Sequence, residues 1–433
     1  MLLIHRATLL SALLSTSTLA AAAQPPSLPL YVAKPAEGAR VLFGDFDVQK
    51  PLEGVSGRMD DDPKLPQAVV TLRRSARDGA ADALNLGWKD AWFSTVRVES
   101  KPIDLRPYLA RGVVSFDLKV NELANGGLSF RLDCGTDCER KVPYVLPARA
   151  AQGQGWRHLR YALSCFHHEG DDFSAVTQPF ALDGTGAGDV EIANLRIDAA
   201  GKPNESCPDY RTVSVTPEPL NESWSLDWWM PRHRDKLAEI ARRKAAGEAT
   251  GLVFIGDSIT HNWEKENKAL WDGFYGRYHP LNLGYGGDRT ENVLWRLQHG
   301  EVDGIAPKVA VLMIGTNNNG LRHDDPAITV AGIRRDIQEL QRRLPRTKVL
   351  LLAIFPRGER ADDGLRLTND KVNALLPALA DGKRVVFLNI NKAFLAPDGS
   401  LSREIMPDLL HPNDKGYRIW AAAMQPELDR MMR

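Results

Sequence analysis

The sequence predicts two domains of different classes: an antiparallel β-sandwich, followed by an α/β domain built on a parallel sheet. In residues 30–200, apolar and polar side chains alternate in short runs such as VVSFDLKV at 113–120, and glycine-rich turns separate these runs. This period of two, with no helical pattern between the runs, is typical of an antiparallel sandwich. In the second half, nearly continuous apolar runs alternate with amphipathic stretches such as AGIRRDIQELQRRLP at 331–345. That alternation is typical of a parallel sheet covered by helices on both faces.

Shifts in composition divide the chain of 433 residues into four segments. At the N-terminus, basic residues precede a short apolar stretch and a run of alanines, which is typical of a signal peptide cleaved near Ala23. We therefore expect a secreted or periplasmic protein, and no later run is long enough to span a membrane. The four predicted segments are a signal peptide at 1–23, the sandwich at 24–200, a proline-rich linker at 201–224 and the α/β domain at 225–433.

The charge balance excludes one class of partner. Lys and Arg together number 55, and so do Asp and Glu. Since there is no excess of positive charge to attract phosphates, we expect no nucleic-acid partner. One Asp and one His near the C-terminus are too few ligands for a metal site, so we expect neither a metal nor a cofactor.

The four cysteines fit an exported protein, because an even number in such a chain indicates disulfides. Three pairings are open, of which we favour a local Cys134–Cys138 bridge and a longer Cys165–Cys207 bridge. A zinc site is the alternative, but the stretch CGTDC has no second pair of ligands nearby.

Ser258 stands at an informative position in the stretch GLVFIGDSITHNW at 251–263. The apolar run predicts a buried strand that ends at Gly-Asp-Ser, with a helix starting directly after it. A serine at such a turn is either a helix cap or a nucleophile, and alone it does not distinguish the two.

Three other polar stretches fall at or near the ends of predicted strands, where ligands bind in open parallel sheets. Gly287, in NLGYGGDRT, allows a backbone N–H to approach a substrate, and Asn317, in GTNNNG, offers a neutral amide donor for an oxyanion. In MPDLLHPNDKG, Asp408 and His411 have the spacing of a carboxylate that orients a general base. Each stretch alone is more typical of a turn, but with Ser258 they supply every role in serine acyl hydrolysis.

The second half resembles the SGNH, or GDSL-type, hydrolase family, in the branch of the platelet-activating-factor acetylhydrolase catalytic subunits. The resemblance rests on Gly256-Asp257-Ser258, Gly287, Gly315-Thr316-Asn317 and Asp408-x-x-His411, in that order. It implies a flavodoxin-like fold of three layers. It also implies Ser258 as nucleophile, His411 as base and Asp408 as its orienting partner. The implied oxyanion hole is the backbone N–H groups of Ser258 and Gly287 with the side chain of Asn317, although Asn318 and Asn319 remain alternatives.

The first half resembles the ExoP-type sandwich found beside the catalytic domains of bacterial β-glucan glucohydrolases, through stretches such as IDLRPYLARGVVSFDLKV. This resemblance implies a galactose-binding-like jelly roll. Together the two halves indicate an exported esterase that removes acyl groups, acetyl groups in particular, from a poly- or oligosaccharide. A lipid or lysophospholipid acyl hydrolase is the first alternative, and an inactive carbohydrate-binding protein is the second.

Further side chains are expected to contact the substrate. Trp263, which follows Ser258 closely, and Asn318 are the two candidates. Trp228 and Trp229, at the start of the α/β domain, are expected to pin the two domains together, or one of them to border the active-site cleft.

Overall fold

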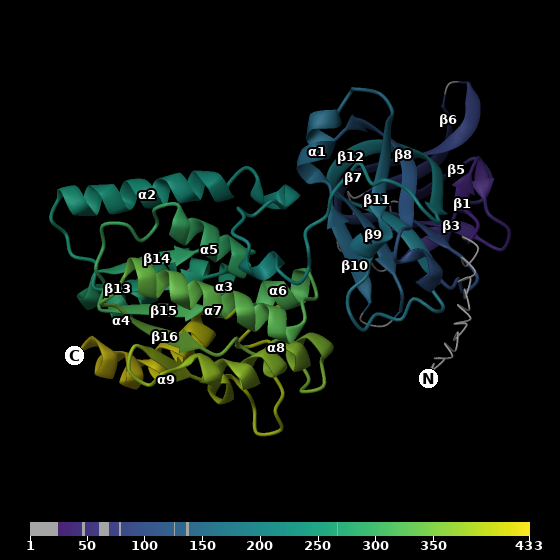
Figure 1. Cartoon of the computed structure of the whole chain (residues 1–433). Helices are drawn as coiled ribbons and strands as arrows, with labels where there is room; N and C mark the ends of the chain where they lie inside the picture. The colour runs from purple at the N-terminus through teal and green to yellow at the C-terminus, as the bar shows by residue number, and fades with distance from the viewer. Residues whose placement is uncertain are drawn as a thin grey trace, which may run out of the picture.

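The computed structural model describes residues 25–433, except residues 46–47, 60–68, 78, 125, 136–137 and 266. The expected signal peptide at 1–23 therefore lies outside the described residues. Figure 1 shows a β-rich N-terminal half beside a layered C-terminal half, and this confirms the predicted pair of fold classes. In the part of the chain that is described, no helix has the length and apolar character needed to cross a membrane.

The N-terminal half is an antiparallel sandwich whose two longest strands pass from one layer into the other. The first part of β12 pairs with β9 and the last part with β8, while β7 runs beside most of its length. The register shifts at Gly184–Gly188, where the strand bends around the buried indole of Trp88. The strands are β1 (Leu28–Val32), β2 (Lys34–Pro35), β3 (Arg40–Gly44), β4 (Gln49–Pro51), β5 (Ser56–Met59), β6 (Val69–Arg77), β7 (Ala80–Glu99), β8 (Val113–Glu122), β9 (Gly127–Asp133), β10 (Glu139–Pro143), β11 (Arg157–Ala162) and β12 (Gln178–Asp198).

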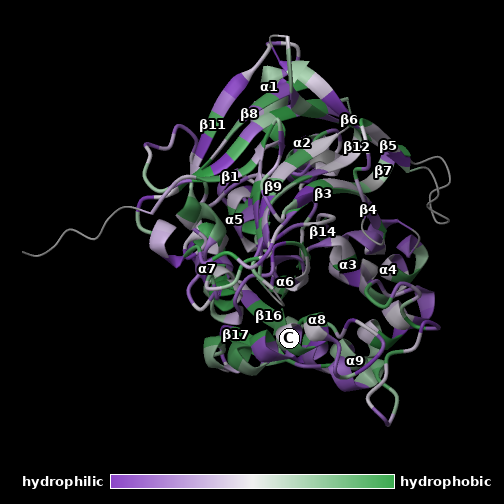
Figure 2. Cartoon of the chain, turned by 90° about the vertical axis from the view of Figure 1, so that its right-hand side faces the viewer, coloured by the Kyte–Doolittle hydropathy of each residue, from purple (hydrophilic) through white to green (hydrophobic). Residues whose placement is uncertain are grey.

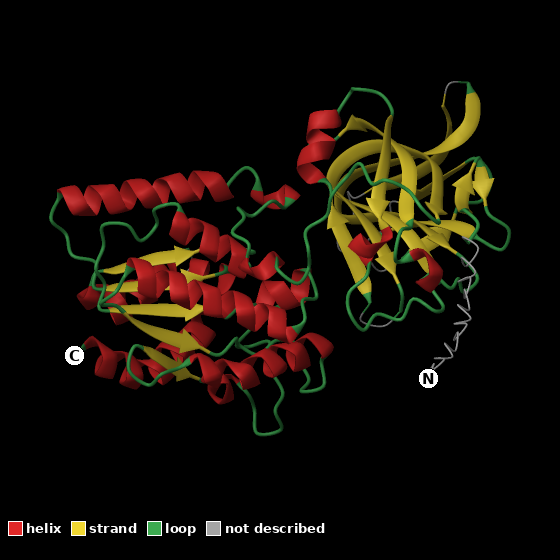
Figure 3. Cartoon of the chain, viewed as in Figure 1, coloured by secondary structure: helices red, strands yellow, loops and turns green. Residues whose placement is uncertain are grey.

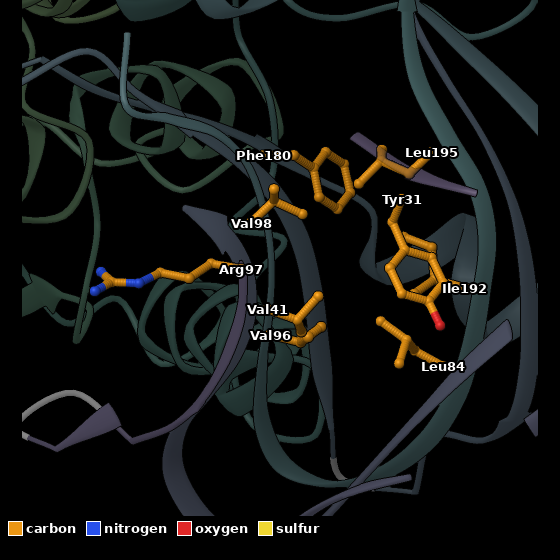
Figure 4. Close-up of a pocket in the computed structure, with 9 residues that line it drawn as sticks. All are labelled: Tyr31, Val41, Leu84, Val96, Arg97, Val98, Phe180, Ile192 and Leu195. Atoms are coloured by element: carbon orange, nitrogen blue, oxygen red, sulfur yellow. The ribbon is translucent and has the colours of Figure 1, made fainter. Parts of the chain in front are cut away.

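The period of two in the sequence puts apolar and polar side chains on opposite faces of these strands. Figure 2 shows hydrophobic and hydrophilic residues alternating along several of them. Phe116, Phe130 and Phe180 meet in the core, with the rings of the first two 4.7 Å apart. An apolar cavity lies in the same core (Figure 4). Most of its lining side chains point toward one another, whereas Arg97 extends away from them. The short helices of this half are η1 (Arg106–Tyr108), α1 (Val145–Ala151) and η2 (Leu163–Phe166).

Both expected disulfides are confirmed. Cys134 is joined to Cys138, directly after β9, and Cys165 in η2 is joined to Cys207. The second bridge ties the sandwich to the segment that leaves it.

The segment that connects the two halves is packed against the α/β domain. The Ser214 hydroxyl in η3 (Val213–Val215) donates to Asp324 at 2.9 Å, and the Asn292 side chain donates to the carbonyl of Glu218 at 2.9 Å. Farther on, η4 (Ser223–Ser225) lies against strands β9 and β12 of the sandwich. The connection therefore contacts both domains.

The C-terminal half contains a parallel sheet with the strand order β14-β13-β15-β16-β17. Numbered within the domain this order is 2-1-3-4-5, which is that of flavodoxin-like folds and confirms the expected topology. The strands are β13 (Leu252–Gly256), β14 (Pro280–Gly284), β15 (Val309–Met313), β16 (Lys348–Leu352) and β17 (Val385–Leu388).

Helices cover both faces of this sheet, which explains why its strands are apolar throughout. One face packs on α2 (Trp229–Ala245), α5 (Thr290–Gln298), α7 (Pro326–Arg343) and α8 (Gly364–Leu375), and the other on α4 (Lys268–Tyr275) and α9 (Asp414–Met432). The predicted helical face at 333–344 is buried in the first of these layers. The shorter helices are α3 (Ser258–His261), η5 (Asn262–Glu264), η6 (Gly276–Tyr278), α6 (Thr316–Leu321), η7 (Leu376–Leu379) and η8 (Asn391–Phe394).

The order of the strands also fixes where a site can form. The chain leaves β13 toward one side to form β14 and returns to the other side to form β15, so a crevice is expected at the carboxyl ends of β13 and β15. In Figure 3 the arrowheads of these parallel strands point toward the sandwich.

The two disulfides should contribute unequally to stability. Cys165 and Cys207 are 42 residues apart, whereas Cys134 and Cys138 are 4 apart. Chain entropy then gives about 4 kcal/mol for the longer loop and about 2 kcal/mol for the shorter one. Scanning calorimetry should find a lower Tm for Cys165→Ser/Cys207→Ser than for Cys134→Ser/Cys138→Ser. Equal losses would contradict the assignment of the longer bridge as the main staple.

Candidate active site

Ser258 is the first residue of α3, directly after β13 and Asp257. The helix cap is Asp257, because its side chain accepts a hydrogen bond from the backbone N–H of Ile259 at 3.0 Å. Burial raises the pKa of the Asp257 carboxyl to about 7. Since the cap is supplied by its neighbour, the hydroxyl of Ser258 is left for another partner.

That partner is His411, which lies 153 residues farther along the chain. The Ser258 Oγ and His411 Nε2 atoms are 2.8 Å apart, and His411 Nδ1 lies 2.6 Å from Asp408 Oδ2. This arrangement lets the imidazole accept the serine proton on one nitrogen while the carboxylate orients the other.

The carboxylate of Asp408 is held by its own loop. Its Oδ1 atom accepts hydrogen bonds from the backbone N–H groups of Leu410 at 3.0 Å and His411 at 2.7 Å. Burial raises the pKa of Asp408, but the hydrogen bonds and the nearby imidazole outweigh it, so that the net shift is downward. The carboxylate is therefore kept ionised, as an orienting partner of His411 requires.

The loop after β14 brings Gly287 to the same edge of the sheet. Gly287 has a φ of +76°, which favours glycine. The preceding Gly286 N–H donates to His261 Nδ1 at 3.3 Å, and burial lowers the pKa of that imidazole to about 2, so it stays neutral and accepts. Within the described part of the chain, the N–H groups of Ser258 and Gly287 have no acceptor. They can therefore bind an oxygen atom of a substrate.

The three consecutive asparagines at the start of α6 have different surroundings. Asn317 keeps 7% of its surface exposed, and its Nδ2 donates to the carbonyl of Asp288 at 3.0 Å, which leaves one N–H over. Asn318 is fully buried and bonded to Ser214 and Asp324, so the expectation that it contacts substrate is wrong. Asn319 is also buried and donates to another side chain at 2.8 Å. Of the three, Asn317 is therefore the one that combines some exposure with a spare side-chain N–H.

The expectation that Trp263 contacts substrate is also wrong. Its side chain has 0% exposure and packs under the sheet with Tyr275, Tyr417 and Trp420. Helix α3 is so short that the chain turns at η5, and this turn directs the indole into the core rather than toward Ser258.

A buried ion network lies under the glycine loop. Asp288, Arg296 and Glu301 all have 0% exposure, and Arg296 bridges the two carboxylates, with its Nη2 atom 2.8 Å from Asp288 Oδ2. Trp229 donates its indole N–H to Asp288 at 2.6 Å. Burial raises the pKa of Asp288 to about 6, against the opposing effect of Arg296. Sequence reasoning missed this network, because charged residues on an amphipathic helix are ordinarily solvated.

Trp228 and Trp229 have different surroundings, and both belong to the α/β domain and its connecting segment. Trp229 is buried in the α/β domain beneath Tyr285, and it packs with Leu220 of the connecting segment. Trp228 lies beside Gly286, with its ring centroid 5.9 Å from that of His261. Trp228 therefore borders the site, as one of the two expectations had it.

The class of site follows from the groups at this sheet edge. They are a serine hydroxyl, an imidazole, a carboxylate and N–H donors without acceptors, which together are typical of an acyl-transfer centre.

Residues 254–419 match the GDSL-like Lipase/Acylhydrolase family, and residues 56–197 match a galactose-binding domain-like family. The chain is 34% identical over 220 residues to platelet-activating factor acetylhydrolase IB subunit alpha1 of Homo sapiens, covering 50% of this chain and 89% of that protein. The alpha2 subunit of Rattus norvegicus is 37% identical over 196 residues, covering 44% and 79%. The chain thus belongs to the GDSL-like lipase/acylhydrolase family and is an acylhydrolase.

Solved structures similar to each half also exist. The acetylxylan esterase Axe2 of Geobacillus stearothermophilus is 20% identical, with a TM-score of 0.35, covering 41% of this chain and 94% of that one. The exo-1,3/1,4-beta-glucanase ExoP of a Pseudoalteromonas species is 12% identical, with a TM-score of 0.34, covering 42% of this chain and 21% of that one.

Removal of the buried cation should strongly destabilise the protein. Arg296→Met leaves the carboxylates of Asp288 and Glu301 without their shared partner, which costs about 3–5 kcal/mol of unfolding free energy. As a control, Arg418→Met breaks the exposed pair with Asp414, whose side chains are 58% and 65% accessible, and should cost less than about 1 kcal/mol. Urea unfolding measures both, and similar values for the two variants would contradict the importance of the network.

Proposed function

We propose that Ser258 is the nucleophile of ester hydrolysis, with His411 as general base and Asp408 as its orienting carboxylate. The observation that carries this proposal is the continuous path of hydrogen bonds from Ser258 Oγ through both imidazole nitrogens to Asp408. Oγ attacks the ester carbonyl carbon while Nε2 of His411 takes the hydroxyl proton. The resulting imidazolium then gives this proton to the departing alcohol oxygen as the carbon–oxygen bond breaks.

The second half of the reaction reverses these roles with water. His411 takes a proton from a water molecule, whose oxygen attacks the acyl-serine, and the proton returns to Ser258 Oγ as the carboxylic acid leaves. In both steps a negative charge develops on the carbonyl oxygen. We assign its stabilisation to the N–H groups of Ser258 and Gly287 and to the Nδ2 atom of Asn317, since each of these donors has a proton without an acceptor among the described residues.

We further propose that the acyl group is acetyl and that the alcohol is part of a carbohydrate. Support comes from the galactose-binding-like domain in the same chain, and from the orientation of the sheet, whose carboxyl ends point toward that domain (Figure 3). Export is proposed as well, because two disulfides suit an oxidising compartment. An acetylated poly- or oligosaccharide is then the partner of the enzyme.

A second candidate keeps the chemistry and changes the alcohol. The curated relatives named above are platelet-activating factor acetylhydrolase subunits, and this favours an acetylated phospholipid as the alternative substrate. Both candidate substrates, the carbohydrate ester and the phospholipid, carry an acetyl group. A preference for short acyl chains therefore does not distinguish between them.

Replacement of the proposed catalytic residues should abolish turnover without unfolding the protein. Ser258→Ala and His411→Ala should each lower kcat for 4-nitrophenyl acetate by roughly 10³-fold or more, and Asp408→Asn by less, because Asp408 only orients and stabilises the imidazolium. His299→Ala, which removes an exposed histidine stacked on Trp295, is the control and should keep full activity. Most activity remaining in folded Ser258→Ala would exclude the mechanism.

The substrate class is tested by acyl-chain and alcohol preference. Wild-type enzyme should hydrolyse 4-nitrophenyl acetate faster than the octanoyl ester, and it should release acetate from acetylated polysaccharides faster than from platelet-activating factor. Ser258→Ala supplies the background rate. Faster octanoyl turnover would overturn the acetyl assignment, and faster release from the phospholipid would overturn the carbohydrate assignment.

A further inference from the structure

Trp224, in η4 of the connecting segment, is a large aromatic side chain that remains 46% exposed. Most large apolar side chains of the described chain are buried, and an indole held half in solvent buries less apolar area than it could. A residue that only packed one domain on the other would be covered. The exposure of Trp224 therefore calls for an explanation beyond packing.

The position of this indole is defined by the proposed oxyanion loop. A Cβ atom placed on Gly287 would lie within van der Waals overlap of the six-membered ring of Trp224, so the ring rests directly on that glycine. A Cβ atom placed on the neighbouring Gly286 would lie 3.4 Å from the ring of Trp228. Any group larger than hydrogen at Gly287 would displace the Trp224 ring.

Several contacts hold the indole in place. Its ring stacks on Trp228, with centroids 6.3 Å apart and planes inclined by 23°, and the Trp228 indole N–H donates to the Trp224 carbonyl at 2.9 Å. Strands β9 and β12 of the sandwich lie against η4, the element that carries Trp224. The sandwich thus supports the segment that brings Trp224 to the active-site edge.

We propose that Trp224 is a substrate-binding residue that stacks on the sugar ring bearing the acetyl group. This inference rests on the proposed function, in which Gly287 binds the carbonyl oxygen of the bound ester. A ring in contact with Gly287 then lies beside the substrate, and the flat, apolar face of an indole complements the C–H face of a pyranose. Trp224 acts in binding and orientation and takes no part in proton transfer.

The test compares two acetate esters that differ in the presence of a sugar ring: glucose pentaacetate and ethyl acetate. Trp224→Leu keeps apolar bulk but removes the flat face, and Trp224→Phe keeps a flat face. We expect Trp224→Leu to raise KM for glucose pentaacetate by about tenfold, the effect of an aromatic contact worth roughly 1.4 kcal/mol, with kcat/KM for ethyl acetate within about twofold. Trp224→Phe should recover most of the loss.

Leu146→Ala is the matched control, because Leu146 is 51% exposed on α1 of the sandwich. This variant should leave KM and kcat/KM unchanged for both esters. Tm measurements on all variants establish that they are folded. The role of Trp224 is overturned if Trp224→Leu leaves KM for glucose pentaacetate unchanged, or if it lowers kcat/KM for both esters by the same factor. The carbohydrate assignment stands in either case. If wild-type enzyme hydrolyses ethyl acetate but not glucose pentaacetate, the carbohydrate assignment fails, and the role of Trp224 fails with it.

Discussion

The active-site edge depends on the buried ion pair between Asp288 and Arg296. Asp288 is bonded at once to Arg296 of α5, to the indole of Trp229 in α2 and, through its carbonyl, to the side chain of Asn317. Taking these charges out of water is costly, and only a complete set of partners compensates for it. These bonds tie the loop that carries Gly287 to α2, to α5 and to the side chain of Asn317, which we propose as a further oxyanion donor. An oxyanion site needs this rigidity, because its donors stabilise charge only if they are in place before the charge forms.

The hydrogen bonds of the proposed catalytic residues connect the two ends of the α/β domain. Ser258 follows the first strand of the sheet, whereas Asp408 and His411 lie just before the last helix, so the site forms only when the whole domain has folded. The connecting segment adds a third part. It is bonded to the α/β domain through Ser214, and it carries Trp224 against Gly287. The proposed substrate site is thus built from the hydrolase domain together with the segment that the sandwich supports.

The predicted fold classes and both disulfides follow from local patterns: a period of two, continuous apolar runs, and cysteine count in a chain expected to be exported. The contact of Ser258 with His411, and the placement of Gly287 and Asn317 in loops at the same edge of the sheet, could be anticipated because these residues follow strands or precede a helix there. Nearness in sequence was a poor guide to nearness in space at Trp263, which the turn after α3 directs into the core. The Arg296 network and the contact of Trp224 with Gly287 could not be predicted, since both depend on long-range packing that leaves no periodic signal.

The central claim is that Ser258 forms a covalent acyl intermediate in this site. Its most direct test is treatment of the folded enzyme with a 4-nitrophenyl alkylphosphonate, whose tetrahedral phosphorus mimics the transition state and traps the attacking atom. Inactivation should parallel the release of one equivalent of 4-nitrophenol per enzyme, because the same displacement causes both. Peptide mass spectrometry should then place the phosphonyl group on Ser258. Loss of activity with the label on another residue, or full activity after exhaustive treatment, would contradict the account.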